Sequence, residues 1–414
     1  MFPCQTLCPT LCPNPMPDPL NDPAKPAAPA AESLPVPMLD LGRQYDPLRP
    51  EILAALDHLL KTHEFILGEP VAAFEREAAA HLGVQHAIGC ASGTDALWLA
   101  LAAARVGPGH AVLTSPFSFF ASVSAILRAG AAPVLADIDP ATFNLSPAAV
   151  ASVLSSPRGA NVRALLPVHL YGQCADWSAL ESLAKPRNLL LIEDAAQAFG
   201  ARWQQKPAGA LGHAAAFSFY PTKNLSAAGD AGMVTTNDDE IAERARMLRQ
   251  HGMRSRYLHD ELGWNARLDT FQAAILRIKL KHIDHWNHAR HTVVRRYHAL
   301  FHAAGIAESG PYPTHGIVLP HEVPGSRHVW HQYVIRTARR DALRDFLTAR
   351  RIGSEIYYPL PLHMQPALAS LGYKEGDFPE SERAAREVLA LPIFPELRED
   401  EQQTVVHALA DFLS

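Results

Sequence analysis

The chain has 414 residues, of which 48% are hydrophobic; this suits a large globular enzyme of about two domains and excludes a wholly disordered chain. With 37 basic and 42 acidic residues and no basic block, its charge pattern does not favour nucleic acid. Five cysteines are too few for a disulfide scaffold.

The sequence also argues against a membrane or secreted protein. The longest apolar run near the middle of the chain, residues 96–104, is far shorter than the roughly 20 residues that cross a bilayer. The first residues lack both the basic segment and the unbroken apolar segment of a secretory signal. We therefore expect a cytoplasmic protein.

Residues 1–37 hold 11 of the 34 prolines, and they are rich in alanine. We expect this segment to be disordered, because it cannot bury enough apolar surface to offset the entropy of ordering, and we expect the folded chain to start near Met38. Its evenly spaced Cys4, Cys8 and Cys12 have no fourth ligand nearby, so no metal site is expected. Cys90 and Cys174 are interpreted as small core residues.

From residue 38 to residue 265, apolar runs of strand length alternate with segments of helical periodicity. This alternation predicts an α/β domain with a mostly parallel sheet covered by helices on both faces. The predicted strands are 86–91, 111–115, 133–138, 164–169, 189–193, 214–219 and 233–236, and the predicted helices are 94–104, 118–127, 175–184 and 238–250.

Residues 266–414 predict a smaller α+β domain that follows a long spine helix over 266–305. The histidines of Lys281–His291 recur every third residue and so drift around that helix, which favours a solvated or interface surface over a metal site. The further elements expected are strands at 329–336 and 354–358 and helices at 340–350, 379–389 and 399–413.

Three segments carry the groups of a cofactor site. Ser92–Asp95 follows a predicted strand and opens a helix, which is typical of a phosphate site or of an ordinary helix cap. A buried strand ends in Asp194 at the sheet edge where open α/β sheets bind ligands. The next strand delivers Ser218 and then Lys223. A lysine, a carboxylate and phosphate donors together are what pyridoxal phosphate requires.

In eight motifs and their order, residues 38–414 resemble the DegT/StrS-type (DegT/DnrJ family) sugar-nucleotide aminotransferases. The resemblance implies the aspartate-aminotransferase fold, which is fold type I of the pyridoxal-phosphate-dependent transferases. The motifs are Phe65–Pro70, Ala91–Leu97, Ser115–Ser122, Pro167–Gly172, Glu193–Gln197, Phe217–Lys223, Gly263–Asp269 and Tyr357–His363.

The resemblance implies roles for individual residues around the cofactor ring. Lys223 would form the Schiff base with pyridoxal 5'-phosphate, and Asp194 would pair with the pyridine nitrogen. Gln197 would contact the phenolic oxygen of the ring, and Phe119 would stack on its face. Lys223 and Asp194 are the residues expected to act in catalysis.

The resemblance further implies that the phosphate is shared between two subunits. Gly93, Thr94 and Ser218 would hold it, with help from Asn265 of a second copy, so a homodimer with shared active sites is expected. The substrate residues that it implies are His169, Tyr357, Tyr358 and His363. No metal is expected.

Two departures from the family pattern stand out. Ala231 replaces a glycine of the usual Gly-Asp-Gly-Gly sequence, which questions the local turn, and residues 1–37 have no counterpart. Two alternatives remain open. A related sugar dehydratase would carry His in place of Lys223, and a non-catalytic regulatory protein on the same scaffold would be expected to lose Lys223 or Asp194.

The function expected from this resemblance is transfer of an amino group from L-glutamate to a nucleotide-linked keto-sugar. Residues 363–366 and 376–379 look most like members that act on 3-keto sugars, and a 4-keto substrate is the close alternative. The product would serve the synthesis of lipopolysaccharide, capsule or glycosylated metabolites.

Overall fold

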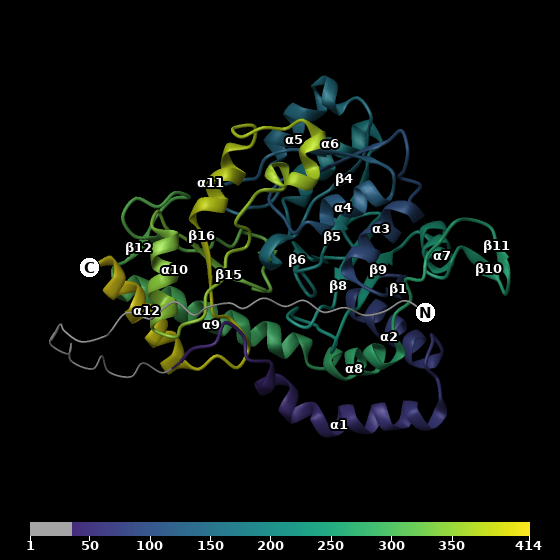
Figure 1. Ribbon diagram of the computed structural model, residues 1–414, viewed down its shortest axis with the longest axis horizontal. Helices are drawn as coiled ribbons and strands as arrows, with labels where there is room; N and C mark the ends of the chain where they lie inside the picture. The colour runs from purple at the N-terminus through teal and green to yellow at the C-terminus, as the bar shows by residue number, and fades with distance from the viewer. Residues whose placement is uncertain (1–34) are drawn as a thin grey trace, which may run out of the picture. The chain divides into compact units, whose positions relative to one another are not determined.

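A seven-stranded sheet forms the centre of the computed structural model, which describes residues 35–414 (Figure 1). Its strands are β1 (His86–Cys90), β2 (Ala111–Thr114), β3 (Ala132–Leu135), β4 (Val162–Leu166), β5 (Leu190–Asp194), β8 (Ala214–Ser218) and β9 (Gly232–Thr236). Their order is β1-β9-β8-β5-β4-β2-β3, and only the two pairs made by β9 are antiparallel. The predicted α/β class and mostly parallel sheet are confirmed.

Helices cover both faces of this sheet, because alternate residues of a strand face opposite sides. In β8, Ala214 and Ala216 belong to one core cluster, whereas Ala215 and Phe217 belong to the other. The first cluster includes α3, α4 and α7, and the second includes α2 and α8. The helices of this part are α2 (Glu69–Leu82), α3 (Gly93–Ala103), α4 (Ala121–Arg128), α5 (Pro147–Leu154), α6 (Trp177–Ala184), α7 (Asp239–Leu248) and α8 (Thr270–Leu280).

A four-stranded sheet of order β12-β13-β15-β16 lies in the C-terminal part, as the expected α+β pattern requires. Both sheets belong to one compact unit, residues 34–414, so a domain boundary at residue 265 stays a prediction. The elements are β12 (Ala307–Glu308), β13 (Ile317–Val318), β15 (Tyr333–Arg336), β16 (Val388–Leu391), α9 (Ile283–Ala303), α10 (Arg340–Ala349), α11 (Pro379–Glu387) and α12 (Glu399–Leu413).

Four predicted elements differ clearly from the structure, and one of them is the strand expected over 329–336, which covers only Tyr333–Arg336. The single helix expected over 266–305 is two helices, which are separated by a turn at Lys281 and His282. The strand expected over 354–358 forms only one bridge, between Glu355 and Ala390. The helix expected to reach residue 389 ends at Glu387, because Val388–Leu391 is wholly buried and pairs with β15.

The folded chain starts earlier than expected. Val36 is 1% exposed; its N–H donates to the carbonyl of Arg351 (3.1 Å) and its own carbonyl accepts from Gly353 N–H (2.8 Å). The expectation of disorder is therefore wrong for residues 35–37, while residues 1–34, including Cys4, Cys8 and Cys12, lie outside the described residues. The elements not yet named are α1 (Leu41–Thr62), β6 (Arg202–Trp203), β7 (Lys206–Pro207), β10 (Met253–Ser255), β11 (Leu258–His259) and β14 (Ser326–Arg327).

Two further expectations concern the core and the membrane. Cys90 and Cys174 are buried, with 0% and 1% exposure, as predicted. Within residues 35–414 there is no helix whose length and hydropathy would allow it to span a bilayer.

Candidate active site

Three strand ends converge at one edge of the large sheet. Asp194 ends β5, Ser218 ends the adjacent parallel β8, and the turn after β1 leads into α3 at Gly93. Since β1 runs parallel to β8 across β9, all three lie at the carboxyl edge, where open α/β sheets bind ligands. The structure thus brings to one sheet edge three segments that the sequence assigned to the cofactor site.

Two glycines let the turn before α3 approach β8 and β9. A Cβ on Gly93 would lie 2.6 Å from the Ser218 Cβ, and a Cβ on Gly232 would lie 2.2 Å from the Ser92 carbonyl oxygen. Ser92 caps α3 by accepting the Asp95 N–H at 3.1 Å. The N–H groups that open α3 have no acceptor within the helix, so together with the Ser218 hydroxyl they form a cradle that suits a phosphate.

Asp194 lies at the end of a chain of side-chain hydrogen bonds. The Ser122 hydroxyl donates to Asp194 Oδ2 at 2.7 Å, and the Ser118 Oγ lies 2.8 Å from the Ser122 Oγ. Burial raises the pKa of Asp194, whereas the Ser122 hydrogen bond opposes that rise. A cationic N–H partner would hold the carboxylate ionised, which is what a protonated pyridine nitrogen provides. Sequence reasoning gave neither serine a role, although both lie in a quoted motif.

The neighbouring Glu193 faces the opposite side of the sheet. Three backbone N–H groups from residues 209–212 donate to it at 2.7–2.9 Å, and His169 Nε2 lies 3.1 Å from its Oε2. His169 is 0% exposed, and its Nδ1 accepts from the Ala175 N–H at 3.2 Å. The predicted substrate role of His169 is therefore wrong: both of its nitrogens are occupied, and it braces Glu193.

Lys223 follows β8 in a turn in which its N–H donates to the Tyr220 carbonyl at 2.8 Å. Burial lowers the pKa of its amino group to about 8, and the charge of Asp194 opposes that shift. A sizeable share of the amine is thus neutral near pH 7–8, the form that attacks a carbonyl.

His331 is a site residue that sequence reasoning missed. Its Nδ1 lies 3.1 Å from Asn224 Oδ1, and burial, followed by the charge of Lys223, holds its pKa well below the ordinary value. It lies inside a predicted apolar strand, residues 329–336, and no motif marked it. The segment just before β15 brings it to the site, since Asn224, next to Lys223, also donates to the Val329 carbonyl at 2.9 Å.

Gln197, which is expected to contact the cofactor ring, is hydrogen-bonded to Tyr171 and Tyr358. Its Oε1 accepts the Tyr171 N–H at 2.6 Å and its Nε2 donates to the Tyr358 hydroxyl at 3.2 Å, while the Tyr171 hydroxyl donates to the Tyr357 carbonyl. The Phe119 ring lies 6.3 Å from that of Tyr358 and is 60% exposed, so a face remains open to a stacking partner.

Thr94 lies in the first turn of α3, whereas two other predicted residues lie apart from these contacts. His363 is 3% exposed, with its Nε2 3.0 Å from Glu382 Oε1 and its ring packed edge-on against Phe378. Asn265 is exposed beside Trp264, and in the described chain no hydrogen bond joins it to Ser218. Its expected contact to the phosphate of a second copy stays a prediction.

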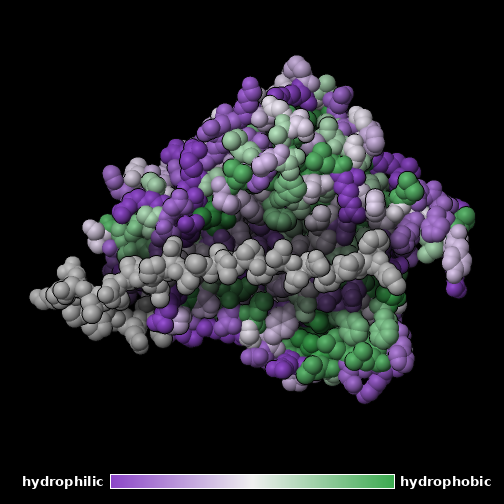
Figure 2. Space-filling view, viewed as in Figure 1, coloured by the Kyte–Doolittle hydropathy of each residue, from purple (hydrophilic) through white to green (hydrophobic). Residues whose placement is uncertain are grey.

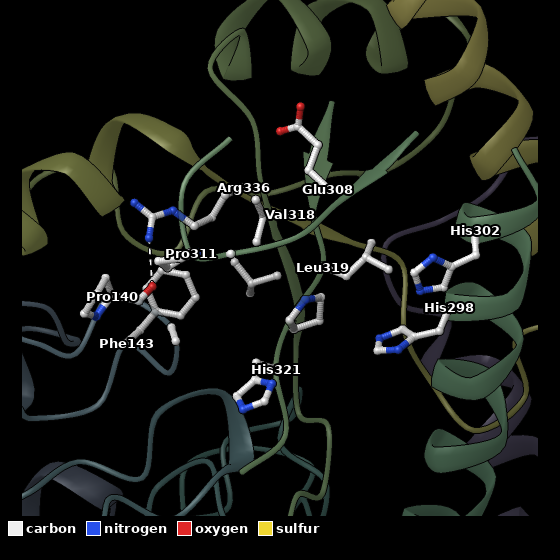
Figure 3. A pocket seen from close by; sticks show the side chains of 14 residues that line it. Pro140, Phe143, His298, His302, Glu308, Pro311, Val318, Leu319, His321 and Arg336 are labelled. Atoms are coloured by element: carbon white, nitrogen blue, oxygen red, sulfur yellow. Dashed lines mark hydrogen bonds between the residues drawn. The ribbon is translucent and has the colours of Figure 1, made fainter. Parts of the chain in front are cut away.

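A cavity of about 340 Å³ lies elsewhere (Figure 3). His298 and His302 reach toward it from α9, and Arg336 of β15 faces it beside Phe143. The Arg336 guanidinium is already held by Glu387 (2.7 Å) and by the Pro140 carbonyl (2.8 Å). None of Lys223, Asp194 and Ser218 lines this cavity, so it is distinct from the candidate active site.

Residues 47–410 match the model of the DegT/DnrJ/EryC1/StrS aminotransferase family. The chain belongs to this family. A "Pleiotropic regulatory protein" of Geobacillus stearothermophilus is 50% identical over 91% of this chain and 98% of its own length. The "dTDP-3-amino-3,4,6-trideoxy-alpha-D-glucose transaminase" of Streptomyces venezuelae is 44% identical over 92% and 97%. The crystal structure of S. venezuelae DesV with a ketimine intermediate has a TM-score of 0.86, with 43% identity over 92% and 99%.

The DegT/DnrJ/EryC1/StrS family membership confirms the predicted fold, the aminotransferase class and pyridoxal phosphate as cofactor. The residues present fit that cofactor: an amine of lowered pKa, a buried carboxylate and a glycine-lined cradle lie at one sheet edge. In residues 35–414, no group of three or more His, Cys, Asp or Glu side chains is arranged to hold a metal ion.

Proposed function

We propose that the protein transfers an amino group from L-glutamate to the keto carbon of a nucleotide-linked sugar, with a 3-keto sugar slightly favoured. The supporting observation is the Lys223 amine and the hydrogen-bonded Asp194 carboxylate at one sheet edge, close enough for the charge of each to shift the pKa of the other. The 3-amino sugar in the name of the Streptomyces relative supports the position.

The roles of the side chains follow from their surroundings. Pyridoxal phosphate supplies an electron sink for the charge left when an α-proton is removed. Asp194, oriented by Ser122, would accept the N–H of the protonated ring. The amine of Lys223, with its pKa of about 8, would serve as the base that moves the proton. Gly93, Thr94 and Ser218 would hold the phosphate.

The absorbance spectrum of the purified protein tests this reaction. We expect a cofactor band that depends on Lys223, that changes with L-glutamate and that returns with a keto-sugar nucleotide. Lys223→Ala should lose the band of the bonded cofactor and lower the rate at least 10³-fold, because the variant has no amine at this position to bond the cofactor. A band without amino transfer to any sugar would favour a regulatory protein, the function named for the Geobacillus relative.

We also propose a homodimer with shared sites. Figure 2 shows apolar residues gathered over α1 and its neighbours, where Leu53 and Leu60 are 55% and 57% exposed. Next to Asn265, Trp264 is 50% exposed and Leu262 is 96% exposed. Exposed apolar side chains next to Asn265 support the proposal that a second copy of the chain covers this surface.

Mixing two inactive variants tests the shared site. Chains with Asn265→Ala and chains with Lys223→Ala should be nearly inactive alone. Their equimolar mixture should recover up to about a quarter of wild-type activity, since about half of the dimers are heterodimers and each has one of its two sites intact. Native mass spectrometry would establish that heterodimers are present. Heterodimers without activity would place Asn265 outside the partner's site.

A further inference from the structure

Lys279 of α8 is a buried amine that none of the family motifs contains. It is 0% exposed, and its Nζ lies 2.6 Å from the Ser226 Oγ and 4.2 Å from the centre of the Tyr45 ring. Trp286 lies on another side, at 5.8 Å. No carboxylate of the described chain lies within salt-bridge distance of Lys279, so the rings and one hydroxyl are its surroundings.

Stability alone does not account for an amine at this place. Burial lowers the pKa of Lys279 to about 7, and the charge of Glu396 opposes that shift. An apolar side chain of similar length would pack between Tyr45 and Trp286 without that desolvation cost. What the amine provides is its hydrogen bond to Ser226.

Ser226 stands three residues after Lys223 in the loop between β8 and β9 and is itself 0% exposed. Besides backbone hydrogen bonds such as that from the Ala227 N–H to the Phe219 carbonyl (2.8 Å), side chains from other elements hold this loop. Three further anchors come from α1, α8 and α9: the Tyr45 hydroxyl donates to the Ala227 carbonyl (3.0 Å), the Ala228 N–H donates to Gln272 Oε1 (2.8 Å), and Asn224 Nδ2 donates to Asn287 Oδ1 (2.8 Å).

We propose that Lys279 is a positioning residue that, through Ser226, fixes the loop which presents Lys223 to the cofactor. The inference rests on the proposed function, because that function gives Lys223 the role of bonding the cofactor and Lys279 would act by positioning Lys223. The two side chains share one hydrogen bond, from Lys279 Nζ to Ser226 Oγ. Removing either the amine or the hydroxyl therefore frees the loop at Ser226. The helix that carries Lys279 stays held by its apolar neighbours Ile275, Leu276 and Ile278.

The test compares Lys279→Met, Ser226→Ala and the double variant with wild type. Lys281→Met is the matched control, since Lys281 lies two residues on and its amine pairs with Glu51 at the surface (2.9 Å). In the cofactor-free protein, mass spectrometry follows the labelling of Lys223 by an amine-reactive reagent. In the loaded protein, a pH titration follows the cofactor absorbance.

We expect labelling of Lys223 at least three times faster in both single variants and a midpoint of the absorbance titration shifted by 0.5 pH unit or more. The double variant should match the single ones, and Lys281→Met should match wild type. Lower melting temperature with unchanged labelling and midpoint would assign Lys279 to packing alone and overturn the proposal. So would single effects that add in the double variant. Labelling needs no cofactor, so a wild type without a cofactor band would count against the proposed function alone.

Discussion

Asp194 and Glu193 are adjacent carboxylates whose partners set different chemistry. Glu193 accepts three backbone N–H groups and a histidine, which leaves no capacity for a ligand. Asp194 has one serine hydroxyl on Oδ2 and a weak backbone contact on Oδ1 (3.3 Å). The carboxylate with fewer partners is the one available to a cofactor.

Ser122→Ala tests how far this hydrogen bond controls Asp194. The bond favours the ionised carboxylate, so its loss should raise the pKa of Asp194 further, and the carboxylate should protonate at higher pH. We expect the acidic limb of the kcat–pH profile to move up by about one pH unit, from a charged hydrogen bond of about 1.5 kcal/mol. Activity would then be lost earlier as pH falls.

Ser124→Ala is the control for that measurement. Ser124 lies on the same helix, but its hydroxyl donates to the Ala121 carbonyl at 3.4 Å instead of to Asp194. Its pH profile should match wild type. Equal shifts in both variants would show that helix α4, and not the hydrogen bond, controls the acidic limb.

At the scale of elements, the cradle depends on how closely α3 approaches β8. Gly93→Ala places a Cβ 2.6 Å from Ser218, so the start of α3 must move away from the strand end. We expect the Kd for pyridoxal phosphate to rise at least ten-fold, because both the N–H groups and the hydroxyl lose their common geometry. Equilibrium dialysis of the cofactor measures it.

Gly107→Ala serves as the matched substitution for Gly93→Ala. The atom nearest to a Cβ at Gly107 is the Ala129 carbonyl oxygen at 3.3 Å, in a loop away from the cradle. Its cofactor Kd should stay within two-fold of wild type. A similar rise in both variants would mean that general loosening, and not the cradle, lowers the affinity.

The sequence predicted the alternating elements of the large sheet because their apolar runs are short and bounded by polar turns. It did not predict the turn at Lys281 and His282, since neither glycine nor proline marks it. Val388–Leu391 was assigned to a helix because an apolar run alone does not separate a buried strand from a helix end. Tertiary pairing with β15 decides that case.

In the candidate site too, local sequence predicted some residues, whereas the role of others depends on tertiary contacts. Lys223, Asp194 and Ser218 were predicted because each ends or follows a strand within a motif. His331, Ser122 and Lys279 were not, because their roles depend on partners far away in the chain. His169 was assigned wrongly for the same reason: its partner Glu193 is visible only in the folded chain.

At the scale of the whole molecule, the N-terminal boundary sets what can be removed. The family match starts at residue 47, whereas Val36 already pairs with Arg351 and Gly353. A chain of residues 35–414 should therefore keep wild-type cofactor affinity and activity. A chain of residues 39–414 should lose about 1–3 kcal/mol of stability, from one buried valine and two backbone hydrogen bonds.

Urea unfolding and steady-state rates distinguish these two truncated chains. If residues 35–414 fold but lose activity, the first 34 residues have a functional role. If residues 39–414 are as stable as residues 35–414, the bridge at Val36 contributes nothing measurable.

The alternation along β5 also limits how the gene can change. Successive side chains of a strand face opposite sides of the sheet. An insertion or deletion of one codon within residues 190–193 would therefore move the Asp194 side chain to the other face, toward residues 209–212. A substitution changes the side chain on one face of β5 only, whereas a change in length alters both faces at once. Chimaeras with related enzymes should therefore join segments outside β5 and keep its five residues intact.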